Sequence, residues 1–334
     1  MKNKNDKKGA RFNKNKGVND KNADIKENKN GCALKKLNIN FGGWFFTSCI
    51  CAYLLLQLVY AVVVTVVAQK TGATTEVVGE KTAFKFLAYC VCGTAIFACA
   101  LFYSLKEKTN LLSCVKVKKF SLKYAGIAVA CLFGLLLGLG KANDLFVYLL
   151  NKLGYNPPQV TLPPASVGNY LLGLLCICLL PALVEEFLFR GVILTAFGDF
   201  STVTAVILNG VLFSLFHMSP AQTVYQFLVG ATYALIARKS GSVIPTTIMH
   251  FLNNALVLTL TYFFPQVNLY AGLKGIILMI VGLVALVISC VWLFKQKDQN
   301  DLPESNKKLK IKDFYAYLGG VAVCVFMWLV NLFA

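Results

Sequence analysis

The sequence predicts an all-α membrane protein, a polytopic bundle of about eight to nine transmembrane helices that enclose an intramembrane cavity. Two observations predict this fold class. The chain of 334 residues is 57% hydrophobic and only 14% charged, which is too apolar for a soluble globular protein of this size. Its apolar residues also gather in runs of roughly 20, the length that crosses the hydrocarbon core of a bilayer.

Nine apolar runs are candidate spans. They cover residues 44–68, 86–105, 124–140, 168–196, 202–218, 221–237, 243–264, 271–294 and 314–334. The third, fifth and sixth runs are short, so we expect these helices to be tilted, partly re-entrant or covered by neighbouring helices. The expected number of spans is therefore eight to nine.

The lysine and arginine residues test this topology. With a cytoplasmic N-terminus, the segments on the inner side hold 26 of the 33 basic residues, and those on the outer side hold six. This split obeys the positive-inside rule. The net charge of +18 thus reflects topology and not a nucleic-acid partner, because the lysines alternate with asparagines and acids rather than with aromatic residues. We expect a multi-pass integral protein, in the cell membrane if the chain is bacterial, with membrane lipids around it.

Polar segments divide the chain into four parts. Residues 1–40 contain too little apolar surface to fold and predict a disordered basic cytoplasmic arm. Residues 41–294 form the transmembrane bundle. Residues 295–313 are a basic linker, and residues 314–334 are expected to form a peripheral C-terminal transmembrane helix.

Twelve cysteines raise the question of a disulfide or metal framework. The closely spaced ones are the i,i+2 pairs Cys49/Cys51, Cys90/Cys92 and Cys176/Cys178. On a helix, two residues apart means about 200° around the axis, so the members of a pair do not face each other. No CxxC is present, and we interpret the cysteines as small lipophilic side chains.

Three charged side chains lie well inside the apolar run 168–196, namely Glu185, Glu186 and Arg190. A charge at the centre of a bilayer costs about 2.5–3.5 kcal/mol on insertion scales, which favours a functional interpretation. Glu186 and Arg190 are i,i+4 and are expected to form an ion pair that supports the structure. Glu185 points about 100° away and remains a lone carboxylate, suited to be a general base for water. Pro181 is expected to kink the helix near these acids.

The chain has two histidines, both in apolar surroundings. His217 follows Phe213 by four residues at the end of a short apolar run, where an ordinary interior histidine is the alternative interpretation. His250 and Asn254 are also i,i+4, so both can donate hydrogen bonds to one point and stabilise an oxyanion. An interhelical polar contact is the alternative for this pair. Asn253 points elsewhere and is the weaker candidate of the two asparagines.

The depths of these residues do not agree along the predicted spans. At ~1.5 Å per residue, Glu185 lies about 24 Å from the outer edge of its span and His250 about 12 Å from the inner edge of its own, which is a similar depth. His217 falls near the outer end of the run 202–218. Either that helix starts deep in the membrane or the predicted boundaries are wrong.

Together, the segments EEFLFRG, FSLFH and RKSGSVIPTTIMHFLNN resemble the three signatures EExxxR, FxxxH and HxxxN of the CAAX protease and bacteriocin-processing family (CPBP or Abi), also called type II CAAX prenyl proteases. The resemblance covers about residues 165–265. It implies an all-helical bundle of about eight spans around a hydrophilic cavity. It also implies peptide-bond cleavage, after a prenylated cysteine in eukaryotes and often on small secreted peptides in bacteria.

The resemblance implies roles for the residues already singled out. Glu185 with His217 would activate the attacking water, and His250 with Asn254 would stabilise the oxyanion. The remaining acid and the arginine of the first motif would be the supporting ion pair, and Phe213 would support the second motif. The expected partner is a peptide or protein substrate, with or without a lipid.

Two questions remain open at this level. Glu185, His217 and His250 could hold zinc in an open three-ligand site, but no HExxH is present and a glutamate-activated water needs no cofactor. A non-catalytic membrane scaffold or a proton-coupled transporter could use the same buried polar groups. No internal repeat favours a transporter, and a non-catalytic relative would tend to have lost one of the three residues.

Overall fold

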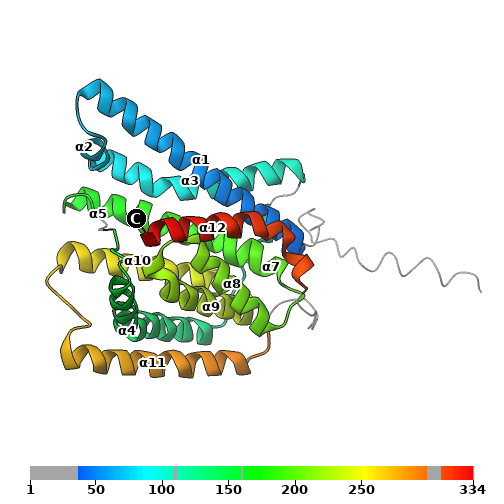
Figure 1. The fold of residues 1–334 in the computed structure, drawn as a ribbon. Helices are drawn as coiled ribbons and strands as arrows, with labels where there is room; N and C mark the ends of the chain where they lie inside the picture. Colours follow the sequence, from blue (N-terminus) through cyan, green and yellow to red (C-terminus); the bar gives the residue numbers. More distant parts are fainter. Residues whose placement is uncertain (1–36, 109–110, 159–160, 299–309, 334) are drawn as a thin grey trace, which may run out of the picture. The chain divides into compact units, whose positions relative to one another are not determined.

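The computed structural model describes residues 37–108, 111–158, 161–298 and 310–333. Most of the predicted basic arm and of the predicted linker lies outside these residues. The described chain is built from helices and contains no strand, which confirms the predicted all-α class (Figure 1).

Twelve α-helices and five shorter helical segments follow one another in the described chain. In chain order they are α1 Ile39–Thr71, α2 Thr75–Gly79, α3 Thr82–Lys106, η1 Leu111–Cys114, α4 Leu122–Lys152, α5 Val167–Gly173, η2 Leu174–Leu179, α6 Leu180–Glu186, η3 Phe187–Ile193, α7 Leu194–Ala196, α8 Thr202–Phe216, η4 Pro220–Gln222, α9 Thr223–Ser240, α10 Ile244–Phe263, α11 Gly272–Lys295, η5 Ile311–Phe314 and α12 Tyr315–Phe333.

Six helices in the described residues are long and apolar enough to cross a membrane: α1, α3, α4, the continuous helix Val167–Ala196, α11 and the helix Ile311–Phe333. The shorter apolar helix α8, with α9 and α10, occupies the other three predicted runs. Each of the nine predicted runs is therefore helical, and the polytopic bundle is confirmed.

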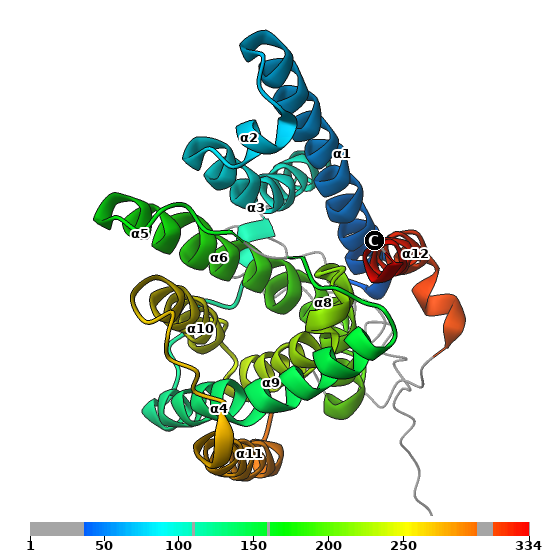
Figure 2. The same cartoon turned by 60° about the vertical axis from the view of Figure 1, so that its left-hand side comes forward.

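Helices pack side by side both with neighbours along the chain and with helices that are distant in sequence. α4 packs along α11, α8 along α9, and α1 along both α3 and α12. α10 contacts α4, α6, α9 and η2 (Figure 2). Glycines permit one of these contacts, because a Cβ added at Gly282 of α11 would lie 2.3 Å from the backbone nitrogen of Gly138 in α4.

The helix that carries the acidic motif changes its winding twice. η2 and η3 are π-helical, and the short α-helix α6 lies between them. Pro181 has no N–H to donate to the carbonyl of Ile177, so the regular α-helical ladder is interrupted there. Changes to π winding are frequent at functional sites. The irregularity expected at Pro181 thus takes the form of altered winding on both sides of Glu185 and Glu186.

Candidate active site

The acidic motif forms a buried ion pair. Arg190 Nη1 donates to Glu186 Oε1 at 2.7 Å, the contact that the i,i+4 spacing predicts, and both side chains are at most 1% exposed. Arg190 Nη2 donates to the carbonyl of Gly230 at 3.0 Å. The guanidinium carbon also lies 4.6 Å from the ring centroid of Phe213. These contacts fix the arginine to α8 and α9 as well as to its own helix.

The neighbouring carboxylate, that of Glu185, does not form such an ion pair with Arg190. Glu185 is 8% exposed, and its Oε2 has no hydrogen-bond partner among the described groups. That oxygen lies 3.9 Å from His250 Nε2, which is longer than a direct hydrogen bond. Burying a carboxylate oxygen without a partner is costly, so structural stability alone does not account for Glu185.

His250 lies between the two acids. Its Nδ1 is 3.1 Å from Glu186 Oε1, and its Nε2 faces Glu185. With a carboxylate at Nδ1, the neutral ring carries its hydrogen on Nδ1 and leaves Nε2 as an acceptor. Nε2 carries a hydrogen only in the imidazolium form. His250 therefore connects the paired acid to the unpaired one.

His217 caps the C-terminus of α8 and is partly buried. Its Nδ1 lies 2.8 Å from the carbonyl of Phe213, which assigns the hydrogen to Nδ1 and leaves Nε2 as an acceptor. The Phe213 ring contacts both imidazoles, with centroid distances of 4.8 Å to His217 and 6.1 Å to His250. Glu185 is close enough to His217 to interact with it electrostatically.

The C-terminal end of α8 lies close to His250 of α10. A helix of 15 residues covers only about 22 Å, less than the ~30 Å of the hydrocarbon core. The Phe213 ring near its C-terminal end contacts both imidazoles, so Glu185, His217 and His250 lie close together although α8 is short for a full crossing.

Asn254 takes part in a chain of hydrogen bonds. Its Nδ2 donates to the carbonyl of Ile177 at 3.3 Å, the carbonyl that Pro181 cannot serve. Its Oδ1 accepts from Asn253 Nδ2 at 3.2 Å, and Asn253 Oδ1 accepts from the hydroxyl of Tyr225 at 3.0 Å. One N–H of Asn254 remains for another acceptor. Asn253, which lies about 100° around the helix, nevertheless contacts its neighbour.

Three groups on α9 surround the site and were missed in the sequence. Gly230 supplies the carbonyl that receives Arg190. Tyr233 is fully buried, its ring lies 6.0 Å from that of His250, and its hydroxyl has no described partner. Tyr225 begins the asparagine chain. The two tyrosines are eight residues apart and share a helix face, which is the only local signal that could have indicated them.

The three potential zinc ligands do not form a metal site in this arrangement. Within the part of the chain that the structure describes, no three His, Cys, Asp or Glu side chains come together closely enough to hold a metal ion. In the described arrangement, Glu185, His217 and His250 are therefore not gathered as a zinc site.

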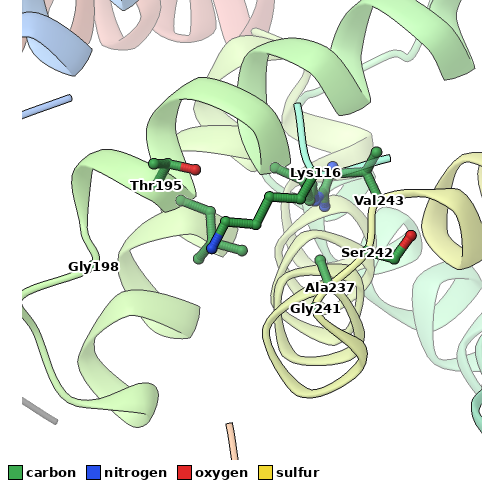
Figure 3. Close-up of a pocket in the computed structure, with 9 residues that line it drawn as sticks. Lys116, Thr195, Gly198, Ala237, Gly241, Ser242 and Val243 are labelled. Carbon is green, nitrogen blue, oxygen red and sulfur yellow. The ribbon is translucent and has the colours of Figure 1, made fainter. Parts of the chain in front are cut away.

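A small cavity of about 20 Å³, large enough for about one water molecule, lies against Arg190. Its other lining residues come mainly from the end of α7 and the turn between α9 and α10: Lys116, Leu194, Thr195, Gly198, Ala237, Gly241, Ser242 and Val243. The Lys116 side chain extends toward Thr195 and Gly198 (Figure 3). Glu185, Glu186, His217 and His250, which we call the acid–imidazole cluster, do not line this cavity, so the two are separate.

Comparison with known proteins agrees with the motifs. Residues 167–256 match the family described as type II CAAX prenyl endopeptidase Rce1-like. No curated protein and no solved structure matches the chain. The matched residues contain all three motifs and the helices that bring them together. Through this region, the chain resembles the type II CAAX prenyl endopeptidase family.

Proposed function

We propose that this protein hydrolyses a peptide bond within the membrane, with a water molecule activated by Glu185. The observation that carries the proposal is the buried carboxylate oxygen of Glu185, which has no hydrogen-bond partner and faces His250, beside a second acid whose Oε1 is paired with both Arg190 and His250. A carboxylate held without a partner in a largely dry site is available to take a proton from water.

His217 supports the same step from the other side. Because its Nδ1–H is directed to the Phe213 carbonyl, its Nε2 presents a lone pair. We assign Glu185 and His217 jointly to the orientation and deprotonation of the attacking water. The water oxygen would form a bond to the scissile carbonyl carbon, and its proton would pass to the Glu185 carboxylate.

The tetrahedral intermediate then needs donors for its oxyanion. We assign this role to His250 and Asn254, which lie one helical turn apart on α10. Asn254 has one amide hydrogen beyond the one it gives to Ile177. His250 can donate from Nε2 only as an imidazolium, because its Nδ1 is directed to Glu186. Stabilisation of the oxyanion thus couples His250 to the acidic motif.

Collapse of the intermediate breaks the bond to the leaving nitrogen. The proton held on Glu185 would pass to that nitrogen, which leaves as an amine, and the carboxylate is regenerated. The water supplies the hydroxyl of the new carboxyl group and the hydrogen of the new amine, so the step balances without a redox partner. Glu186 and Arg190 hold the helix and take no part in proton transfer.

The substrate is a peptide segment presented within or at the membrane, either a lipid-modified C-terminus or a small secreted or leader peptide. The test compares peptides recovered from cells that produce the wild type with those from cells that produce Glu185→Ala. We expect a set of cleaved peptides that depends on Glu185. Solute flux in proteoliposomes that survives Glu185→Gln, with no peptide cleaved by either protein, would instead support a transporter.

A further inference from the structure

Two side chains of the C-terminal helix α12 donate hydrogen bonds to the turn and helix start that follow His217. Asn331 Nδ2 of α12 donates to the carbonyl of Met218 at 2.8 Å. Trp328 Nε1, also on α12, donates to Thr223 Oγ1 at 2.8 Å. α12 lies outside the residues that match the protease family, which end at residue 256. The contact therefore links a separate part of the chain to the segment that carries the second motif.

The turn itself has an unusual backbone. Met218, directly after His217, has a φ of +51°, which non-glycine residues rarely adopt. Such a conformation costs of the order of 1–3 kcal/mol and persists only where the surroundings enforce it. Met218 is buried, so its side chain contributes to this enforcement, and the hydrogen bond at its carbonyl contributes as well.

Thr223 is the second fixed point of the turn. Its carbonyl accepts from Ser214 Oγ at 2.7 Å, and its hydroxyl contacts the carbonyls of Pro220 at 2.9 Å and of Ser219 at 3.1 Å. These bonds connect the end of α8 to the start of α9. Trp328 donates to the same hydroxyl. The turn is thus closed internally at Thr223 and braced externally by α12.

General packing does not account for the two donors. The buried residues of α12 are Ala316, Tyr317, Gly320 and Cys324. Asn331 is exposed and Trp328 is half-buried. A polar amide on an apolar helix is usually placed to satisfy a particular partner, and here that partner is a carbonyl at a helix C-terminus, where acceptors lack intrahelical donors.

We propose that Asn331 and Trp328 are positioning residues, which keep the His217 imidazole directed toward Glu185 by bracing the strained turn. Without the brace, Met218 would relax toward a negative φ, and the backbone of His217 would rotate with it. The expected consequence for the rate rests on the proposed function. The expected consequence for the orientation of His217 does not.

The test uses the fact that the chain has only two histidines. Histidine labelled with ¹⁵N would give two sets of imidazole signals from the full-length protein in detergent, one from each histidine, assigned with His217→Ala. We expect Asn331→Leu and Trp328→Phe to shift the His217 signal and to leave that of His250 in place. Asn331→Asp, which has the same shape but no amide donor, should act like Asn331→Leu. Val330→Ala, on the same helix and 43% exposed in the wild type, is the control.

The second measurement is peptide turnover. We expect each brace variant to lower kcat about tenfold, the effect of one lost hydrogen bond, with KM unchanged. The limb of the kcat–pH profile that reports His217 should move, and Asn331→Gln, which keeps a donor, should recover part of kcat. A lower melting temperature with both imidazole signals and the pH profile unchanged would overturn the proposal. If the wild type cleaves no peptide, the proposed function fails, and the imidazole signals still decide whether the brace exists.

Discussion

Two groups of buried charges in this molecule differ in how their carboxylates are paired with cations. Asp298, which follows α11, forms ion pairs with two cations at the end of α9. Its carboxylate oxygens lie 2.6 Å from Arg238 Nε and 2.6 Å from Lys239 Nζ. Beside the acid–imidazole cluster, Arg190 forms an ion pair with Glu186, which is only one of the two neighbouring carboxylates. The first group has an excess of cations and holds its acid tightly. The second leaves Glu185 without a hydrogen bond at Oε2.

The Asp298 cluster also has additional neutral partners. Thr202 donates to Asp298 at 2.8 Å, Arg238 to the carbonyl of Phe200 at 2.9 Å, and Lys239 to that of Gln296 at 2.7 Å. These bonds tie the residues after α11 to the ends of α7, α8 and α9, which is a structural task. The comparison shows that the fold can place a cation against each oxygen of a buried carboxylate, so Glu185, which has no such ion pair with a lysine or arginine among the described residues, is the candidate for chemistry.

Glu186→Gln should have the largest effect on stability, because it leaves Arg190 as an unpaired cation in the interior. Breaking one partner of a buried pair costs about 3–5 kcal/mol. We expect a large fall in melting temperature in detergent. Glu185→Gln is the matched control and should melt near the wild type. Equal stability of the two variants would remove the distinction between a structural and a functional acid.

His250→Ala and Asn254→Ala should each lower kcat by about 10²–10³, the usual cost of one oxyanion donor, with little change in KM. Because the two donors act on one oxygen, the double variant should be scarcely worse than the poorer single variant. Steady-state kinetics on a cleaved peptide checks this. Fully additive losses would show that the two residues serve different steps.

Asp298→Asn tests the other side of the comparison. Hydrogen bonds to charged groups contribute about 1.5–3 kcal/mol, and we expect a loss of stability of this order with kcat retained at temperatures where the variant is folded. The matched variant Asp144→Asn, at an exposed position of α4, should be closer to the wild type. Loss of turnover without loss of stability would contradict a purely structural role for Asp298.

The same cluster predicts a pH dependence. Burial raises the pKa of Asp298, but hydrogen bonds from Lys239, Arg238 and Thr202 lower it further, so that it lies below its ordinary value. A depressed pKa contributes stability that is present above the unfolded pKa of about 3.9 and is lost as the pH falls through the folded value. The melting temperatures of the wild type and Asp298→Asn should therefore differ at pH 7 and converge below about pH 4. A difference that stays constant down to pH 3 would contradict this.

Tyr225→Phe and Asn253→Ala should have the smallest effects. They remove links in the chain that orients Asn254 but leave its bond to Ile177. We expect kcat to fall several-fold and by less than for Asn254→Ala, since a neutral hydrogen bond contributes about 1 kcal/mol. A loss as large as that of Asn254→Ala would mean that Asn253 itself contacts the substrate.

Much of this molecule could be predicted because it is local. Apolar runs identify helices, and i,i+4 spacing identifies the contact of Glu186 with Arg190. The contact of His250 with Glu186 joins residues 64 positions apart, and no local pattern contains it. The depth of His217 could not be predicted, because a run of 15 to 17 residues does not reveal whether its helix crosses the membrane.

Other features depend on partners that the sequence does not connect. Pro181 predicts an irregular helix, but the donor that serves Ile177 comes from Asn254 on another helix. Two other long-range contacts likewise exist only in the packed bundle. They are the ion pairs of Asp298 with Arg238 and Lys239, and the hydrogen bond from Asn331 to the carbonyl of Met218. The partners of polar groups that are distant in sequence therefore cannot be predicted from local patterns, and the structure is needed to identify them.

The central claim is that Glu185 is retained for chemistry and not for stability. The most direct test measures turnover and melting temperature on the same purified preparation of Glu185→Gln, with a peptide that the wild type cleaves. We expect a melting temperature like that of the wild type and a kcat lower by about 10²–10⁴, the usual contribution of a general base. A folded Glu185→Gln protein that cleaves the peptide at the wild-type rate would contradict a catalytic role for Glu185.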